Sequence, residues 1–162
     1  MIIAATGHRP DKLGGHSEGV RRRLRSLAID YLQAEQPDAV ISGMARGWDQ
    51  AIAEAAIELH LPFIAAVPFE GQAKRWPPES QAHYARLLGQ AASIEIVSEF
   101  PGARAMQQRN EWMVDRGGKM CALWDGSMGG TFNCIRYAKK VGRPIDNLWP
   151  RWANDLRDLL SS

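Results

Sequence analysis

From Lys119 to Gly142 the chain reads KMCALWDGSMGGTFNCIRYAKKVG, a short apolar run followed by a cluster of small residues and then a helical pattern. The apolar run at 120–124 has the length of a strand buried on both faces. From Thr131 onward, apolar residues recur at the spacing of one helix face. A strand, a glycine loop and a helix in this order predict a phosphate-binding geometry. Glycines let the backbone approach an anion, and the first N–H groups of the helix point at it.

The loop between this strand and helix supplies the first group of predicted ligand-binding residues. They are Asp125, Gly126, Ser127, Gly129, Gly130 and Thr131. Their spacing matches neither the nucleotide-triphosphate P-loop, which ends in Gly-Lys-Ser/Thr, nor the dinucleotide-binding pattern Gly-x-Gly-x-x-Gly. A glycine-lined turn that holds no ligand is therefore the alternative interpretation of this loop taken alone.

Composition limits the class of protein. The 162 residues are 45% hydrophobic and 23% charged, which predicts a single domain over 1–162. We expect this domain to end in a short C-terminal helix at about 150–160. A net charge of +2 suits an anionic ligand and makes a dedicated nucleic-acid partner unlikely. Cys121 and Cys134 fall within the central motif and are expected to be small core residues. We predict no metal site and no cofactor.

The sequence predicts neither a signal peptide nor a transmembrane segment. Its first residues lack the charged region and long apolar run of a signal peptide, and no segment reaches membrane-spanning length. We therefore expect a cytoplasmic protein without a membrane partner.

Strand-like and helix-like segments alternate along the chain. The expected strands lie at 2–6, 39–41, 63–67, 93–97, 120–124 and near 145. The expected helices lie at 18–34, 50–59, 79–88, 103–115, from 131 to about 141 and 150–160. This alternation predicts a Rossmann-like α/β fold in three layers, with a mainly parallel sheet and helices on both faces. Ligands of such sheets bind beyond the carboxyl ends of the strands, where the strand order reverses.

Two more glycine turns follow predicted strands and extend the candidate site. The ligand-binding residues predicted there are Gly7, His8 and Arg9 after the first strand, and Ser42, Gly43, Arg46, Gly47 and Asp49 after the second. Arginine and histidine supply donors for a phosphate or a sugar, and a carboxylate accepts hydrogen bonds from ligand hydroxyls. The alternatives are an ordinary loop histidine and a carboxylate favoured by the helix dipole.

A polar cluster lies on the predicted helix just before the central strand. It contains Arg109, Asn110 and Glu111, and Asn110 is predicted to bind the ligand. The alternative interpretation of the cluster is a solvated helix face. Arg109 and Glu111 are too close along the helix to form the usual stabilising pair, which needs a spacing of three or four residues.

Two segments carry a family resemblance. SGMARGWDQAIAEAA and DGSMGGTFNCIRYAKKVGRPI resemble the paired motifs of the SLOG superfamily, and the opening TGHRP is similar to its YpsA-type members. The superfamily also includes the DNA-processing protein A domain and the LOG phosphoribohydrolases, which release bases from nucleoside monophosphates. The resemblance spans about residues 1 to 146. It implies a Rossmann-like fold, a nucleotide-type ligand and a homodimer or higher homo-oligomer.

The sequence departs from the LOG hydrolases at their acidic residue. Those enzymes carry a glutamate three residues beyond the Gly-Thr of the loop, and that position is Cys134 here. Their Arg-Lys pair appears as Arg109-Asn110, so the resemblance implies that Arg109 contacts the sugar phosphate. Glu111 is the hypothetical replacement acid, because positive charge develops at the sugar carbon when an N-glycosidic bond breaks.

Three functions follow from the sequence. The first is binding of a nucleotide or nucleotide-derived ligand through the glycine loops. The alternative is a nucleoside 5′-monophosphate N-glycosidase, or phosphoribohydrolase, with Arg109 and Glu111 as its catalytic residues. A further alternative is single-stranded DNA binding, against which the small net charge argues. The missing glutamate favours binding over hydrolysis, and the sequence leaves open whether the protein is an enzyme.

Overall fold

The computed structural model describes residues 1–161 and contains one sheet of six strands. The strands are β1 Ile2–Gly7, β2 Ala39–Ser42, β3 Phe63–Phe69, β4 Ser93–Ser98, β5 Lys119–Leu123 and β6 Ile145–Asn147. The helices are α1 Glu18–Glu35, α2 Trp48–Glu58, α3 Pro78–Leu88, α4 Ala103–Arg116, α5 Gly130–Lys140 and α6 Trp149–Ser161. A single 3-10 turn, η1, covers Pro10–Lys12 between β1 and α1.

The sheet has the order β4-β3-β2-β1-β5-β6, and its neighbouring strands pair in parallel. From β1 the chain first moves outward through β2, β3 and β4, and then returns to the other side of β1 with β5 and β6. The strand order therefore reverses between β1 and β5. In parallel α/β sheets this position opens a crevice at the carboxyl ends of the two strands.

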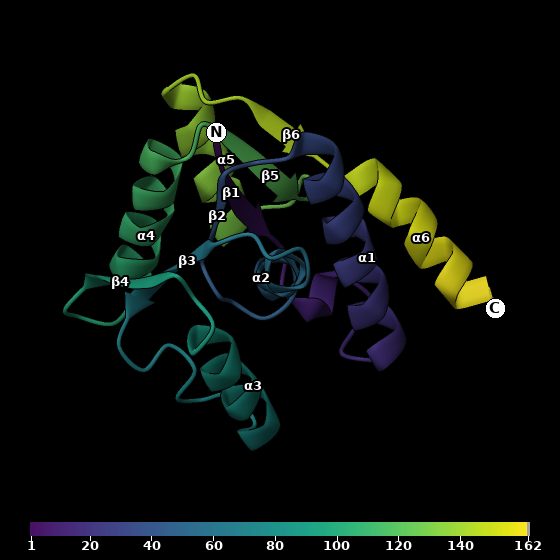
Figure 1. Ribbon diagram of the computed structural model, residues 1–162, viewed down its shortest axis with the longest axis horizontal. Coiled ribbons are helices and arrows are strands. Elements are labelled where there is room, and N and C mark those ends of the chain that lie inside the picture. Colours follow the sequence, from purple (N-terminus) through teal and green to yellow (C-terminus); the bar gives the residue numbers. More distant parts are fainter. Residues whose placement is uncertain (162) are drawn as a thin grey trace.

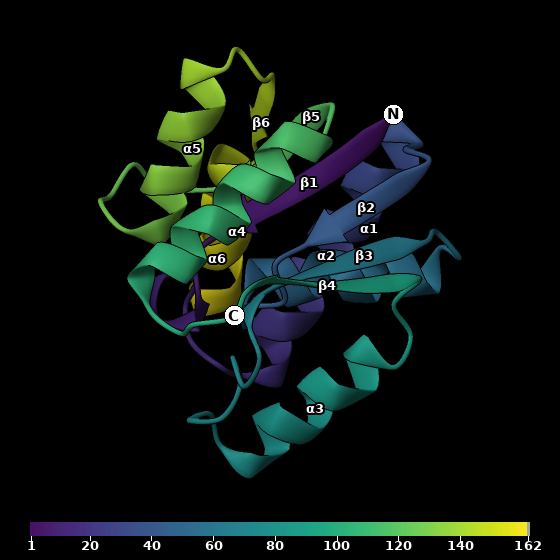
Figure 2. The ribbon, with the colours of Figure 1, turned by 90° about the vertical axis from the view of Figure 1, so that its left-hand side faces the viewer.

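Helices cover both faces of the sheet (Figures 1 and 2). One face carries α1, α2 and α6, whose side chains share a core cluster with Ile3, Val40 and Phe63. The other face carries α4 and α5, which pack with Ala4 and Met120 on a smaller cluster. The arrangement confirms the predicted three-layer, Rossmann-like architecture.

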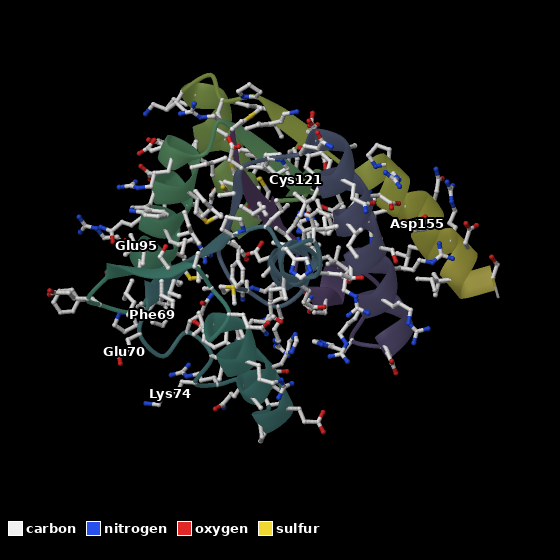
Figure 3. All side chains as sticks on the ribbon, in the orientation of Figure 1. Phe69, Glu70, Lys74, Glu95, Cys121 and Asp155 are labelled. Carbon is white, nitrogen blue, oxygen red and sulfur yellow. The ribbon has the colours of Figure 1, made fainter. Side chains whose placement is uncertain are left out.

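The local signals in the sequence explain individual elements. The buried side of α1 has the spacing of an amphipathic helix and consists of Val20, Leu24, Leu27, Ala28, Tyr31 and Leu32. Ser17 caps this helix, because its hydroxyl accepts a hydrogen bond from the Val20 amide at 3.1 Å. Cys121 and Cys134 are buried free thiols, and Cys121 lies on β5 in the interior of the molecule (Figure 3). Their burial confirms their expected place in the core.

Among residues 1–161, no helix combines the length and the apolar character that crossing a membrane requires.

Candidate functional site

A cleft of about 470 Å³ opens where the strand order reverses. Its walls come from the end of β1 and η1, the start of α2, one side of α4 and the start of α5. Nine predicted site residues line it: Gly7, His8, Arg9, Asp49, Arg109, Asn110, Gly129, Gly130 and Thr131. The structure therefore brings together residues from four segments that are far apart in the sequence.

The glycine loop after β5 presents an open helix N-terminus to this cleft. Gly129 is the residue before α5 and has a φ of 142°, a left-handed conformation that favours glycine. In the described chain, a Cβ built on Gly129 or Gly130 would meet no atom within 4 Å. The first turn of α5 also carries no side-chain cap and no acidic residue. Its N–H groups and the helix dipole are thus directed at space that an anion can fill.

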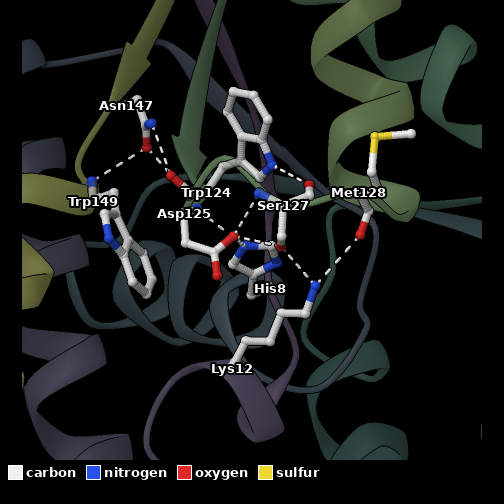
Figure 4. Close-up of polar contacts among 8 residues, drawn as sticks. All are labelled: His8, Lys12, Trp124, Asp125, Ser127, Met128, Asn147 and Trp149. Atoms are coloured by element: carbon white, nitrogen blue, oxygen red, sulfur yellow. Dashed lines mark hydrogen bonds and ion pairs between the residues drawn. The ribbon is translucent and has the colours of Figure 1, made fainter.

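Lys12 of η1 reaches across to the same loop (Figure 4). Its Nζ donates to the Ser127 hydroxyl at 2.7 Å and to the Met128 carbonyl at 3.4 Å. Leu13, the next residue, is fully buried and anchors η1 to the core. This anchored turn therefore holds a cation beside the glycine loop.

His8 and Asp125 join the ends of β1 and β5 (Figure 4). The His8 Nε2 lies 2.7 Å from the Asp125 Oδ1, and Ser127 donates its backbone amide to the same oxygen at 2.9 Å. Burial raises the pKa of Asp125, but the hydrogen bonds from Ser127 and His8 outweigh it and lower the pKa to about 2. Asp125 is therefore ionised and holds the loop in place through these hydrogen bonds. Asp125, Gly126 and Ser127 lie beside the cleft and do not line it.

Asp49 is the buried carboxylate of the cleft. It is 6% exposed, and its Oδ1 has no hydrogen-bond partner within the described structure. Burial raises the pKa of Asp49 to about 6, although Arg109, the Ala45 amide and Arg9 act in the opposite direction. An unpaired buried oxygen of this kind carries a free-energy cost that a ligand hydroxyl or N–H group would relieve.

Arg109 spans the floor of the cleft between two strand ends. Its Nη1 donates to the Gly43 carbonyl at 2.6 Å and to the Ala66 carbonyl at 3.3 Å. Its Nε donates to the Asn110 Oδ1 at 3.2 Å. Within residues 1–161 these bonds leave Nη2 without a partner. Burial lowers the pKa of Arg109, yet a guanidinium stays charged in proteins. Arg109 therefore supports the β2 and β3 ends and keeps one nitrogen available.

The loop after β2 mostly supports the cleft instead of lining it. The Ser42 hydroxyl donates to the Asp49 carbonyl at 2.7 Å, and Gly43 packs so closely on Arg109 that a Cβ would lie 2.5 Å from Nη1. Gly47 has a φ of +96°, and a Cβ there would lie 2.5 Å from the His8 carbonyl oxygen. Arg46 is stacked over Trp76, 5.3 Å from the ring centre. None of these four is among the described residues that line the cleft.

Glu111 does not face the cleft. It lines a neighbouring hollow between α4 and α5, where Gln107 donates to its Oε2 at 3.1 Å. Residues two apart on an α-helix are separated by about 200° of rotation. Glu111 therefore projects from nearly the opposite side of α4 to Arg109. The expectation that the two act on one sugar centre has no geometric support.

Sequence reasoning missed several lining residues, including Lys12, Met106, Gln107 and Asn133. Met106 and Gln107 could have been found from the sequence, because they lie on the same helix as Arg109, three and two residues before it. Asn133 lies in the first turn after the glycine loop. Lys12 gave no local signal, since its role depends on η1 folding back across the loop. Within residues 1–161 no group of three metal-ligating side chains is present.

The fold and the cleft define a Rossmann-like α/β protein with a polar crevice at the strand-order reversal. The chain belongs to the YspA SLOG family, whose YpsA model matches residues 3–142. It is 33% identical over 150 residues to YoqJ, an uncharacterized SPbeta prophage-derived protein of Bacillus subtilis, covering 81% of this chain and 88% of that one. A UPF0398 protein of Brevibacillus brevis is 24% identical over 158 residues, covering 90% and 82% respectively.

Solved structures share the fold at low sequence identity. DNA processing protein A of Streptococcus pneumoniae has a TM-score of 0.63 at 16% identity, and the match covers 98% of this chain and 55% of that chain. The Helicobacter pylori protein, described with a single-stranded DNA binding mode, has a TM-score of 0.62 at 16% identity, covering 99% and 80%. TM1055 has a TM-score of 0.59 at 16% identity, covering 89% and 71%.

Proposed function

We propose that this protein binds a nucleotide or nucleotide-derived ligand in the cleft between β1 and β5. The observation that carries the proposal is the convergence of three features in one hollow: the open N-terminus of α5, the Lys12 cation and the unpartnered Asp49 oxygen. The first two suit a phosphate, and the third suits a hydroxyl donor. A sugar phosphate carries both groups.

In this proposal each wall of the cleft contacts a different part of the ligand. The phosphate accepts hydrogen bonds from the N–H groups at Gly129–Thr131, with Lys12 and Arg9 beside it. A sugar hydroxyl donates to the ionised Asp49 and relieves its unpaired state. The Nη2 of Arg109 remains available for either group.

The test is to incubate the purified protein with ribo- and deoxyribonucleoside monophosphates and NAD-like dinucleotides, and to identify bound and free species by mass spectrometry. Retention of an intact ligand supports the proposal. Asp49→Asn is expected to lower the affinity for that ligand about tenfold, because one charge-assisted hydrogen bond is lost. Failure of every compound to bind at millimolar concentration contradicts it.

A second candidate function is hydrolysis of a nucleoside 5′-monophosphate. In this reaction water attacks the sugar C1′, the N-glycosidic bond breaks, and the base leaves with the proton as pentose 5-phosphate forms. Asp49 favours this candidate, because a carboxylate with a pKa of about 6 lines the cleft and stabilises positive charge near C1′. Release of a free base that Asp49→Asn abolishes and Glu111→Gln retains would support it. Loss of the rate in Glu111→Gln alone would restore the original assignment.

Single-stranded DNA binding is a third proposal. It rests on the fold shared with the Helicobacter pylori protein, which is described as binding single-stranded DNA. Its test is the salt dependence of oligonucleotide affinity, since each phosphate contact releases counterions.

A further inference from the structure

A second hollow, of about 480 Å³, adjoins the cleft between α4 and α5. We call it the α4–α5 groove. It is lined by Gln107, Glu111, Asn133, Arg136, Tyr137 and Lys140. These residues recur at spacings of three and four, so they form the facing stripes of two neighbouring helices. Gln107 and Asn133 line both hollows. The groove therefore begins where the cleft ends.

The groove contains two cations that no carboxylate neutralises. Arg136 and Lys140 are exposed, and neither forms an ion pair in the part of the chain that the structure describes. Arg136 lies 5.5 Å from the centre of the Phe132 ring, a cation–π contact that restrains it. Glu111 is the one carboxylate among the described lining residues. The lining charge is thus net positive and favours an anionic occupant.

The two cations line the groove and not the cleft that the glycine loop borders. Gly129, Gly130 and Thr131 line the cleft, whereas Arg136 and Lys140 line only the groove. A phosphate seated on the glycine loop therefore lies in a different hollow from these side chains. A ligand that uses them needs a second anionic group farther along its length.

Tyr137 offers the groove an aromatic surface. Its hydroxyl donates to the Asp115 Oδ1 at 2.8 Å, which fixes the ring between the two helices. Aromatic rings beside phosphate-binding cations are a common platform for nucleobases, because every base presents a face that stacks. The amides of Gln107 and Asn133 lie between this platform and the cleft.

We propose that the α4–α5 groove is a subsite for the second nucleotide of a phosphodiester-linked ligand whose first phosphate lies on the glycine loop. This inference rests on the proposed nucleotide-binding function. Arg136 and Lys140 contact the second phosphate, and Tyr137 stacks on its base. A free dinucleotide and the 5′ end of a single strand present the same chemistry.

The test compares AMP, CMP, GMP and UMP with the matching 5′-phosphorylated homodinucleotides, such as pApA, by isothermal titration calorimetry. For the base that binds best, the dinucleotide is expected to bind about tenfold more tightly than the monophosphate, because it adds charge-assisted contacts. The double substitution Arg136→Gln and Lys140→Gln is expected to bring this ratio close to one. Glu111→Gln is expected to raise it about twofold by removing a like charge.

Lys139→Gln is the matched control. Lys139 is adjacent in sequence and equally charged, but it lies 6.0 Å from the centre of the Trp124 ring and does not line the groove. Its substitution is expected to leave the ratio unchanged. Circular dichroism confirms that each surface variant is folded.

Three outcomes overturn the subsite. A wild-type ratio near one overturns it and leaves the proposed function standing, because the monophosphate still binds. A ratio that survives the double substitution also overturns it. Failure of every monophosphate and dinucleotide to bind overturns both proposals. Where the subsite holds, a 5′-phosphorylated octanucleotide separates the two sources. If the octanucleotide binds with the same affinity as the dinucleotide, the ligand is a free dinucleotide. If the octanucleotide binds more tightly, the ligand is the 5′ end of a strand.

Discussion

Asp49 couples the cleft to the stability of the molecule. Its carboxylate is largely enclosed by the start of α2, the loop after β2 and the Arg109 side chain, so water solvates its charge only weakly. Burial of an ionised group without full compensation costs free energy, which appears as a raised pKa. A ligand that hydrogen-bonds the carboxylate recovers part of that cost. The same residue therefore lowers the stability of the free protein and favours its complex.

Asp49→Asn is predicted to change how stability depends on pH. The folded pKa of about 6 lies above the ordinary value of 3.8, so the native state holds this proton more tightly than the unfolded state does. The associated stability is present below about pH 4 and is lost as pH rises through 6, with a loss of about 3 kcal/mol at full ionisation. The variant lacks this loss. Urea denaturation should find it more stable than wild type at pH 8 and about equal at pH 4. An equal difference at both values would contradict the prediction.

Gly47→Ala is predicted to destabilise the fold more than Gly126→Ala. Both glycines have positive φ values, 96° and 93°, so both substitutions strain the backbone by about 1–2 kcal/mol. Only at Gly47 does the new Cβ collide with backbone, 2.5 Å from the His8 carbonyl oxygen. At Gly126 no atom of residues 1–161 lies within 4 Å. We expect a total loss of about 3 kcal/mol or more at Gly47. Thermal denaturation of the two variants checks this, and equal losses would exclude the collision as a cause.

At the level of elements, η1 and the start of α5 act as one unit. Pro10 fixes the φ of the first residue of the turn, Leu13 is buried, and Lys12 between them donates to the glycine loop. The turn thereby places a charge next to a helix N-terminus that already favours anions. A phosphate entering the loop meets a donor already held in place, which lowers the ordering cost of binding.

Lys12→Gln is predicted to weaken nucleoside monophosphate binding about tenfold, because one charge-assisted contact to the phosphate is lost. Lys74→Gln is the control, since Lys74 is exposed at the periphery beside α3 (Figure 3). Calorimetric titration of both variants gives the comparison. Equal affinities would show that Lys12 only tethers the loop.

The sequence was sufficient to predict the elements but not their arrangement in space. The sequence pattern located the six strands and six α-helices of residues 1–161 but not η1, and the glycine loop at the end of β5 was evident in the central motif. Strand order is a long-range property, so the sequence did not show that only β1 and β5 flank the crevice. For this reason Ser42, Gly43 and Gly47 were expected to line a site that they support from behind. Glu111 was expected to act beside Arg109, whereas the structure places it in the neighbouring hollow, because residues two apart on a helix face different sides.

On the scale of the whole molecule, most of the arginine-rich α1 is already neutralised. Arg22 pairs with Glu18, Arg23 with Asp155 of α6, and Arg25 with Glu54 of α2, at 3.2, 3.7 and 3.2 Å. The net charge of +2 is therefore not concentrated on that helix. The predicted homo-oligomer stays a prediction, which light scattering of the purified protein tests directly.

The distribution of charge predicts a shallow salt dependence for any nucleic-acid ligand. Five cations face the cleft and groove within the described chain: Arg9, Lys12, Arg109, Arg136 and Lys140. Each neutralised phosphate of a single strand contributes about −0.7 to the slope of log affinity against log salt, so two or three contacts give a slope of about −2. Fluorescence anisotropy of a labelled octanucleotide between low and moderate salt measures it. A slope near −5 or steeper would require a longer track of basic residues, and the proposed ligand would then be a nucleic-acid strand lying across the molecular surface. A slope near −2 corresponds to two or three phosphate contacts, a number that the cations of the cleft and groove are sufficient to supply.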